Sequence, residues 1–316
     1  MTGGDDSILI SVVIPSFDRS MQLARCLEAL ASQSLARERF EVLVVDDGSP
    51  RPPYAVVDAF ASRLAVRMIR QAKAGPAAAR NAGVNAARGT YVAFLDDDCV
   101  PHADWLVSYE CCLREHPHAL LGGPVTNALP HVPFSTASQM LVQFLYEYYG
   151  NGENRLRFFV TANMLIPREG FIAIGEFDRD FPIAAAEDRD LCERWLESAR
   201  RMIFCPAAVV AHAHQLGWRT FVRQHFNYGR GAHYLHRARA RRDQQGFRLE
   251  SIRFYLSLLF YPFRVTTKLY ASGLAALMML SQISYAVGYF TERCAQGAPH
   301  GELQLDGRPG DASRPA

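Results

Sequence analysis

The feature that most constrains the fold of this chain is a set of apolar segments that are followed directly by acidic residues. Residues 8–14 (ILISVVI) form a continuous β-branched run that ends at Pro15, a pattern typical of a strand buried on both faces. Residues 40–49 (FEVLVVDDGS) repeat the pattern and end in carboxylates and a glycine. Between the two, residues 21–35 carry apolar side chains at helical spacing. This order predicts a β-α-β unit, which requires parallel strands.

The alternation continues for two more strands. Residues 66–71 (VRMIRQ) indicate a short third strand, and residues 75–89 form an alanine-rich segment with helical spacing. Residues 91–98 (YVAFLDDD) predict a fourth strand that again ends in acids. Since the carboxyl ends of parallel strands meet at one edge, the sequence predicts an α/β fold with a doubly wound, mainly parallel sheet. A ligand then binds in the crevice at those ends.

The second half of the chain has a weaker pattern. Residues 119–166 mix short apolar runs with an aromatic cluster and suggest structure on the acceptor side of the crevice. Residues 187–200 (EDRDLCERWLESAR) predict a helix, with Arg194 able to pair with Asp190 one turn away. Residues 201–214 predict one further strand.

The C-terminal region is apolar and uncharged over residues 269–290. That length can span a bilayer, but polar residues dilute it, so helices that lie on or in a membrane and a plain packing helix both stay open. Six arginines precede it, interleaved with aromatic residues, and fit a solvated helix face, a gate over a diphosphate or a basic collar at an anionic membrane. They are Arg223, Arg230, Arg237, Arg239, Arg241 and Arg242. We expect residues 296–316, rich in glycine, proline and charge, to be disordered.

Composition excludes several classes of protein. The 316 residues are 49% hydrophobic and 21% charged, which excludes a disordered chain, collagen and a coiled coil. The net charge of +2 is too small for nucleic acid binding, and we expect no nucleic acid partner. The seven cysteines are odd in number and include no CxxC pair, which argues against a zinc ribbon and a disulfide framework and suggests a reducing, cytoplasmic setting. The N-terminus does not read as a secretion signal.

The acidic clusters carry the chemistry. Asp46 and Asp47 in VVDDGS fit a turn and a helix cap as well as a ligand site. Asp96, Asp97 and Asp98 are harder to explain structurally, because three adjacent carboxylates repel one another and are most simply tolerated beside a cation.

Five motifs in order resemble those of family 2 glycosyltransferases. They are SVVIPSFDR, VLVVDDGS, GPAAARNAG, FLDDDC and AAEDRDLCERW, and the resemblance covers residues 8–235. It implies a GT-A fold and inverting transfer from a nucleotide-diphosphate sugar to a glycan or lipid-linked acceptor. It also implies a catalytic domain over residues 1–235, with a nucleotide-binding half (8–120) and an acceptor half (121–235). The apolar and basic pattern after it predicts a helical region over residues 236–295 that either associates with a membrane or packs on this domain. The protein would then lie on the cytoplasmic side, peripheral to or anchored in the inner face of the plasma membrane.

The resemblance implies roles for individual residues. The nucleotide-binding residues would be Pro15, Phe17, Asp18, Asp47, Arg80, Asp96 and Asp97. The family's common Tyr-Asn after the first proline is here Phe17-Asp18. Mn²⁺ or Mg²⁺ would be bound by Asp98, Asp96, His212 and His214, with Asp98 and His212 the first choices.

Catalysis would depend on the ED motif. By this match Asp188 is the general base and Glu187 positions donor or acceptor, while capping of the helix is the structural alternative. Leu191 stands where the processive QxxRW pattern needs glutamine, which favours transfer of a single sugar. Two other functions stay open, a nucleotidyltransferase that acts on sugar phosphates and a catalytically silent scaffold that binds sugar nucleotides.

Overall fold

The computed structural model describes residues 8–150, 158–181, 183–242 and 250–297. From residue 298 onward, the tail expected to be disordered lies outside the described residues.

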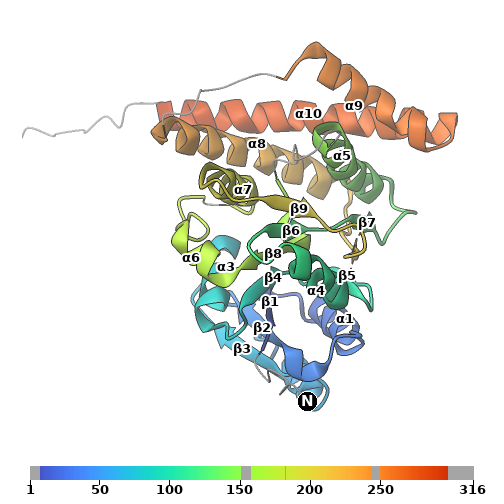
Figure 1. Ribbon diagram of the computed structural model, residues 1–316. Helices are drawn as coiled ribbons and strands as arrows, with labels where there is room; N and C mark the ends of the chain where they lie inside the picture. The colour runs from blue at the N-terminus through green and yellow to red at the C-terminus, as the bar shows by residue number, and fades with distance from the viewer. Residues whose placement is uncertain (1–7, 151–157, 182, 243–249, 298–316) are drawn as a thin grey trace, which may run out of the picture.

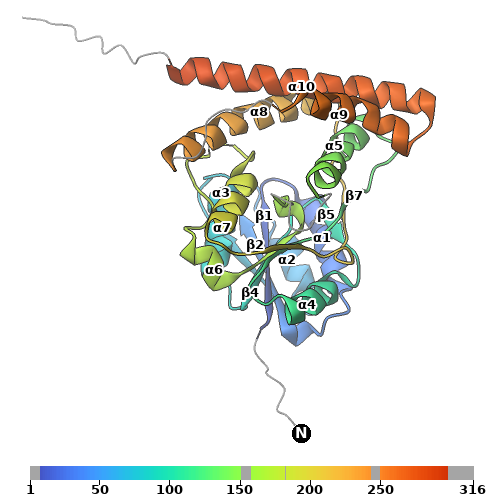
Figure 2. The same ribbon diagram turned by 45° about the horizontal axis from the view of Figure 1, so that its top comes forward.

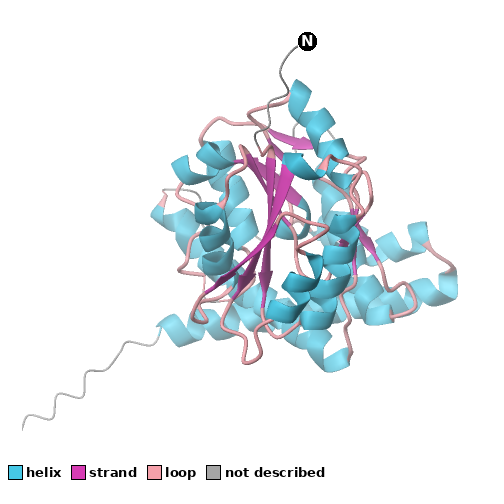
Figure 3. Ribbon diagram, turned by 90° about the horizontal axis from the view of Figure 1, so that it is seen from below, coloured by secondary structure: helices cyan, strands magenta, loops and turns pink. Residues whose placement is uncertain are grey.

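The N-terminal half is the predicted alternation of strands and helices. In chain order it contains β1 (Ile10–Ser16), α1 (Ser20–Ala31), η1 (Arg37–Arg39), β2 (Phe40–Asp46), α2 (Tyr54–Phe60), β3 (Val66–Arg70), α3 (Pro76–Ala86) and β4 (Tyr91–Phe94). The four strands are parallel in the order β3-β2-β1-β4, and every residue of β1 and β2 is buried. Helices flank this sheet on both sides (Figure 3). The buried β-branched runs therefore formed the central parallel strands, as predicted.

Three more strands widen this sheet to seven. They are β8 (Met164–Pro167), β6 (Leu120–Gly122) and β9 (Met202–Phe204), and β8 runs antiparallel to both of its neighbours. A second sheet contains β5 (Cys99–Pro101), β10 (Val210–His212) and β7 (Val125–Asn127). The single strand predicted over residues 201–214 is wrong, because that segment forms β9 in one sheet and β10 in the other. Pro206 and the turn around it separate the two strands.

Helices from the second half complete the packing. They are α4 (Trp105–Glu115), α5 (Pro133–Gly150), α6 (Arg168–Ala173) and α7 (Glu187–Glu197), with η2 (Thr161–Asn163) before β8. Alternate residues of β1 enter two different cores: Val13 packs with Phe94, Phe171 and Phe177, and Val12 packs on the opposite face. The sheet is thus buried on both faces, as its unbroken apolar strands require.

Three long helices form an outer layer over the α/β core (Figures 1 and 2). They are α8 (Trp218–Arg241), α9 (Ile252–Val265) and α10 (Lys268–Gly297), and α8 runs without interruption past residue 235. Helices α8 and α10 touch through glycines: a Cβ on Gly229 would lie 1.8 Å from the Tyr285 carbonyl oxygen, and one on Gly288 would lie 1.9 Å from that of Phe226. Glycine at both positions is what allows this backbone contact.

The structure contains one disulfide that the cysteine pattern did not predict. Cys112 at the end of α4 is bonded to Cys205 after β9, across a sequence separation of 93 residues. The seven cysteines alone therefore do not indicate a reducing compartment.

A single buried asparagine joins the two sheets to α4. The Asn163 side chain is fully buried, and its Oδ1 accepts hydrogen bonds from Trp105 Nε1 (2.8 Å) and the Tyr109 hydroxyl (2.6 Å). Its Nδ2 donates to the carbonyl oxygens of Pro124 (2.9 Å) and Ala208 (2.7 Å). All four polar positions of the amide are thus satisfied inside the protein.

We expect Asn163→Ala to lower the free energy of unfolding by about 3–5 kcal/mol, because it leaves several buried polar groups unpaired. Urea titration followed by circular dichroism measures this. Asn127→Ala is the control, since Asn127 is only half-buried and donates to Thr136 Oγ1, and should cost about 1 kcal/mol. Equal losses for the two variants would contradict the assigned role of Asn163.

Candidate active site

The carboxyl ends of β1, β2 and β4 meet, as the alternation predicted. The Ser16 hydroxyl donates to Asp97 Oδ2 (2.8 Å), and the Asp47 amide donates to the Ser16 carbonyl oxygen (3.0 Å). A cavity of about 2860 Å³ opens above this edge, between the sheet and the helices α5, α8, α9 and α10. Ligand pockets of 300–1,000 Å³ hold molecules of drug size, so this cavity has room for two substrates.

The first two motifs line the cavity unequally. Pro15, Phe17 and Asp47 face it, whereas the exposed Asp18 is not among its lining residues and has a left-handed backbone (φ 52°). The Lys73 ammonium lies 3.7 Å from the centre of the Phe17 ring. The sequence does not predict this contact, because nothing in the local pattern of Lys73 links it to Phe17.

Asp47 already has partners in the protein. Its carboxylate accepts hydrogen bonds from the amides of Ala74 (2.8 Å) and Gly75 (2.9 Å) and from Gln71 Nε2 (2.7 Å). Gly75 adopts φ 89°, which favours glycine, and directly precedes α3. Asp47 therefore shapes the loop that presents α3 to the cavity.

Each of the three adjacent aspartates has a cationic or basic partner within the protein. Arg80 Nη2 lies 2.8 Å from Asp96 Oδ1, and Arg19 Nη1 lies 3.2 Å from Asp97 Oδ1 and 3.1 Å from Asp98 Oδ2. Two guanidinium groups therefore offset part of the repulsion among these acids, and the cation expected beside them stays a prediction. Arg19, missed in the sequence, lies nearly eighty residues from the acids it contacts.

Asp98 and His212 form the metal-binding candidate. His212 Nε2 lies 3.0 Å from Asp98 Oδ1, and the His214 ring stacks on that of His212 at 4.8 Å. Possible ligand atoms of Asp98, Cys99 and His212 all lie within 4.8 Å of one another. The carboxylate oxygen suits Mn²⁺ or Mg²⁺, and the imidazole nitrogen favours a transition ion such as Mn²⁺ over Mg²⁺. Burial raises the pKa of Cys99 and keeps it a neutral thiol. Asp96 points to Arg80 instead.

Burial and neighbouring charges shift the pKa values of the acids and histidines around Asp98 in different directions. Burial alone would raise the pKa of Asp98, but the hydrogen bond and charge of His212, with Arg19, hold it well below its usual range. Burial raises the pKa of Asp97 to about 6, with Arg19 opposing the shift. Burial and the neighbouring His212 lower the pKa of His214 to about 4. Asp98 is therefore ionised, and His214 is a neutral imidazole stacked on His212.

The ED motif begins α7. Glu187, 4% exposed, binds Arg80 Nη1 at 3.0 Å, so Arg80 bridges it to Asp96. Asp188 lines the cavity, and its Oδ1 accepts from the Arg189 amide (2.8 Å). Neither acid caps the helix, because the N-cap is Ala186 and no side chain bonds there. Burial raises the pKa of both carboxyl groups, and the charge of Arg80 opposes the shift in each.

The interleaved arginines of α8 mostly bind other side chains. Their partners are Glu292 for Arg230, Gln296 for Arg237, Glu193 for Arg239, Asp180 for Arg241 and Asp190 for Arg242. Arg223 lines the cavity and has no such partner among the described residues. Most of the basic helix face is therefore structural.

A family model described as glycosyl transferase family 2 matches residues 11–174, slightly more than half of the chain. Among curated proteins, the glycosyltransferase AglE of Haloferax volcanii is 29% identical over 171 residues, which cover 53% of this chain and 55% of that protein. The chondroitin synthase of Escherichia coli is 29% identical over 214 residues, covering 57% and 31% respectively. The chain therefore spans about half the length of these relatives, or less.

Solved structures resemble most of the chain. A mannosyltransferase from Pyrobaculum calidifontis, in complex with GDP-Man and Mn²⁺, gives a TM-score of 0.63 at 16% identity and covers 92% of this chain and 88% of that one. Residues 1–349 of S. aureus TarS, in complex with UDP, give 0.52 at 17% identity and cover 92% and 91%. At such identities the likeness establishes a shared fold.

Proposed function

The chain belongs to glycosyl transferase family 2 and has a GT-A type fold, and from this we propose that it transfers a single sugar, with inversion, from a nucleotide-diphosphate sugar to a hydroxyl group. The observation that carries the proposal is one cavity that joins three features. Pro15 and Phe17 lie at a strand end suited to a nucleotide, Asp98 and His212 offer a carboxylate and an imidazole side by side to a cation, and Asp188 offers a carboxylate without a side-chain partner among the described residues.

Asp98 and His212 would hold Mn²⁺ or Mg²⁺. When bound, the cation would stabilise the negative charge that develops on the diphosphate leaving group. Arg19 contacts the same Asp98 carboxylate and lines the cavity, so its guanidinium is available to the diphosphate as well. His214 packs against His212 and would fix the orientation of that ligand ring.

Asp188 would act as the general base. In a single displacement, a carboxylate takes the proton from the acceptor hydroxyl as its oxygen attacks the anomeric carbon from the face opposite the leaving group. Burial raises the pKa of Asp188, which makes its carboxylate a better proton acceptor near neutral pH. Glu187 is held by Arg80 and would align the site rather than move a proton.

The proposal covers nucleotide-diphosphate sugars as a class and leaves the base and the sugar to be identified. The mannosyltransferase neighbour was solved with GDP-Man and the TarS neighbours with UDP or UDP-GlcNAc, so the fold accommodates both a purine and a pyrimidine. Calorimetry with UDP, GDP, dTDP and CDP, in Mn²⁺ and then in EDTA, would identify the base.

We expect one of these diphosphates to bind at least about tenfold more tightly with Mn²⁺ than with EDTA, and Asp98→Asn to abolish that difference, because the variant loses the anionic ligand. Asp104→Asn is the control, since Asp104 lies at the start of α4 and does not line the cavity. Binding of no diphosphate under either condition would refute the donor class.

We expect Asp188→Asn to lower kcat by about a hundredfold or more while nucleoside diphosphate affinity stays unchanged, because the amide cannot accept the proton. In the wild type, activity should fall as the pH decreases through the raised pKa of Asp188, above the ordinary aspartate value of 3.8. Assays of transfer or donor hydrolysis across pH measure both. A variant that remains fully active would leave Asp188 without a catalytic role, and a wild type without activity would favour the scaffold.

The outer helices suit a membrane surface, and we propose that residues 236–295 dock the enzyme there, as peripheral protein or anchor, on the cytoplasmic face where the donor is expected. Within the described residues, one helix (268–296) is long and apolar enough to span a bilayer, and about a third of its most apolar window is buried (33%). Large apolar side chains are exposed along α9 and α10. They include Ile252, Leu256, Phe260, Phe263, Leu269, Met279, Ile283, Val287 and Phe290.

Basic residues flank this apolar surface. Arg253 and Arg264 lie near the two ends of α9, and both also line the cavity. Lys268 begins α10, and Arg293 lies near its end. An amphipathic layer with basic margins is typical of helices that lie in the interface of an anionic membrane. A glycan or lipid-linked acceptor could then reach the cavity at the membrane surface.

We expect the double variant Phe260→Glu and Ile283→Glu to lower binding to vesicles that contain phosphatidylglycerol by at least about tenfold, because each charge must leave water to enter the interface. Cosedimentation measures the bound fraction. Tyr54→Glu is the control, since Tyr54 is comparably exposed (51%) but lies on α2 in the N-terminal half. Unchanged binding of the double variant would contradict membrane docking through these helices.

A further inference from the structure

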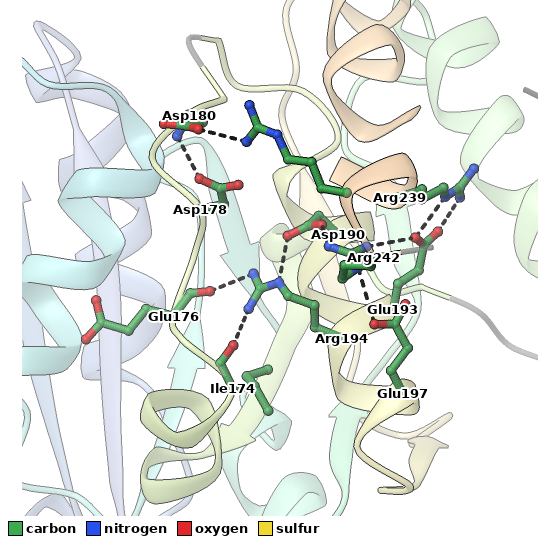
Figure 4. Close-up of polar contacts among 11 residues, drawn as sticks. Ile174, Glu176, Asp178, Asp180, Asp190, Glu193, Arg194, Glu197, Arg239 and Arg242 are labelled. Carbon is green, nitrogen blue, oxygen red and sulfur yellow. Dashed lines mark hydrogen bonds and ion pairs between the residues drawn. The ribbon is translucent and has the colours of Figure 1, made fainter. Parts of the chain in front are cut away.

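We propose that Arg242, at the end of α8, is a positioning residue that holds α7 and thereby places Asp188 in the cavity. The inference rests on the proposed function, in which Asp188 is the base. It concerns the ionic cluster between α7 and α8 in Figure 4, which lies outside the nucleotide and metal residues.

Asp190 is the hub of that cluster. Its carboxylate is 1% exposed and binds two guanidinium groups, Arg194 Nε at 2.8 Å and Arg242 Nη1 at 2.7 Å. Arg194, at the predicted helical spacing, also donates to the carbonyl oxygens of Ile174 (2.7 Å) and Glu176 (2.7 Å). Arg194 thus connects α7 to the loop after α6, and Asp190 both orients Arg194 and connects α7 to α8 through Arg242 (Figure 4).

Helix α7 presents a continuous acidic face to α8. Besides Asp190, Arg242 contacts Glu193 (3.6 Å) and Glu197 (3.3 Å), and Arg239 binds both carboxylate oxygens of Glu193. Residues three, four and seven apart share one side of a helix, so the three acids form one stripe. The end of α8 therefore binds α7 from Asp190 to Glu197.

A second contact lies at the other end of α7. Gly231 of α8 packs on the residue before the left-handed Ala186, and a Cβ at this glycine would lie 2.4 Å from the Ala185 carbonyl oxygen. Ala186 (φ 71°) is the N-cap of α7 and leads directly into Glu187 and Asp188. Helix α8 thus contacts the turn before Asp188 and the helix after it.

These contacts matter for catalysis because the position of Asp188 follows from that of α7, which Arg80 holds at Glu187 and α8 holds from the turn at Ala185 to Glu197. Among the described residues, its carboxylate accepts a hydrogen bond from its neighbour's amide, whereas Asp98 and His212 are held on other elements, after β4 and on β10. Any displacement of α7 therefore changes the distance between base and cation site. A misplacement of about 1 Å can cost about a hundredfold in rate.

The test is Arg242→Gln, because Asp190 keeps Arg194, Arg194 keeps its hydrogen bonds to the loop after α6, and the buried apolar residues of α7 still pack in the core. We expect kcat for hydrolysis of UDP-GlcNAc or GDP-Man, whichever the wild type turns over, to fall by about tenfold to a hundredfold. KM for the donor and the Kd of the matching diphosphate should stay within about twofold, since the nucleotide residues lie on other elements. Arg242→Lys, which keeps the charge but not the planar fork, should recover part of kcat.

Arg241→Gln is the matched control. Arg241 is the neighbouring arginine, and it pairs with the exposed Asp180 instead of α7. If Arg242→Gln has the kcat of Arg241→Gln, or loses diphosphate affinity in proportion to kcat, the inference is overturned. If Arg242→Gln does not fold, Glu193→Gln removes contacts between α7 and α8 from the α7 side. This variant should likewise lower kcat while KM for the donor stays within about twofold. An active Asp188→Asn would instead remove the proposed base itself.

Discussion

The buried guanidinium of Arg80 is the interaction on which the site depends. It rises from α3 and lies between Asp96, which follows β4, and Glu187, which begins α7. Arg80 is 4% exposed and Glu187 is 4% exposed, so neither charge could remain buried without the other. The acids of the sheet edge and the helix that carries Asp188 therefore meet through one side chain, although they lie about ninety residues apart.

Further ion pairs surround the Arg80 site. Arg19 pairs with both Asp97 and Asp98, His212 binds Asp98, and Arg194 and Arg242 enclose Asp190. Such a network gives little net stability when each desolvated charge has one partner, and its value lies in fixing relative positions. As a result, ion pairs fix the positions of both sides of the cavity, the sheet edge on one side and the helices α7 and α8 on the other. Arg223, which has no ion-pair partner among the described residues, lines this cavity from the α8 side.

The sequence predicted what depends on local pattern. Buried β-branched runs located β1, β2 and β4, and their acidic ends located Asp96, Asp98 and the crevice, because strand direction determines where carboxyl ends meet. It could not predict partners chosen by tertiary packing: Arg19 on Asp97, Lys73 on Phe17, and Asn163 between α4 and two loops. Residues 201–214 looked like one strand because apolar content does not reveal which sheet a short strand joins.

The glycine contacts between α8 and α10 bear on how such a chain can diverge. At Gly229 and Gly288 the neighbouring backbone leaves no room for a methyl group, so these sites admit a single residue type. The outward side of α10 meets no such restriction, since any apolar side chain satisfies it. The outer surface of α10 can therefore change one residue at a time, whereas a larger residue at Gly229 or Gly288 would require α8 and α10 to pack at a greater distance.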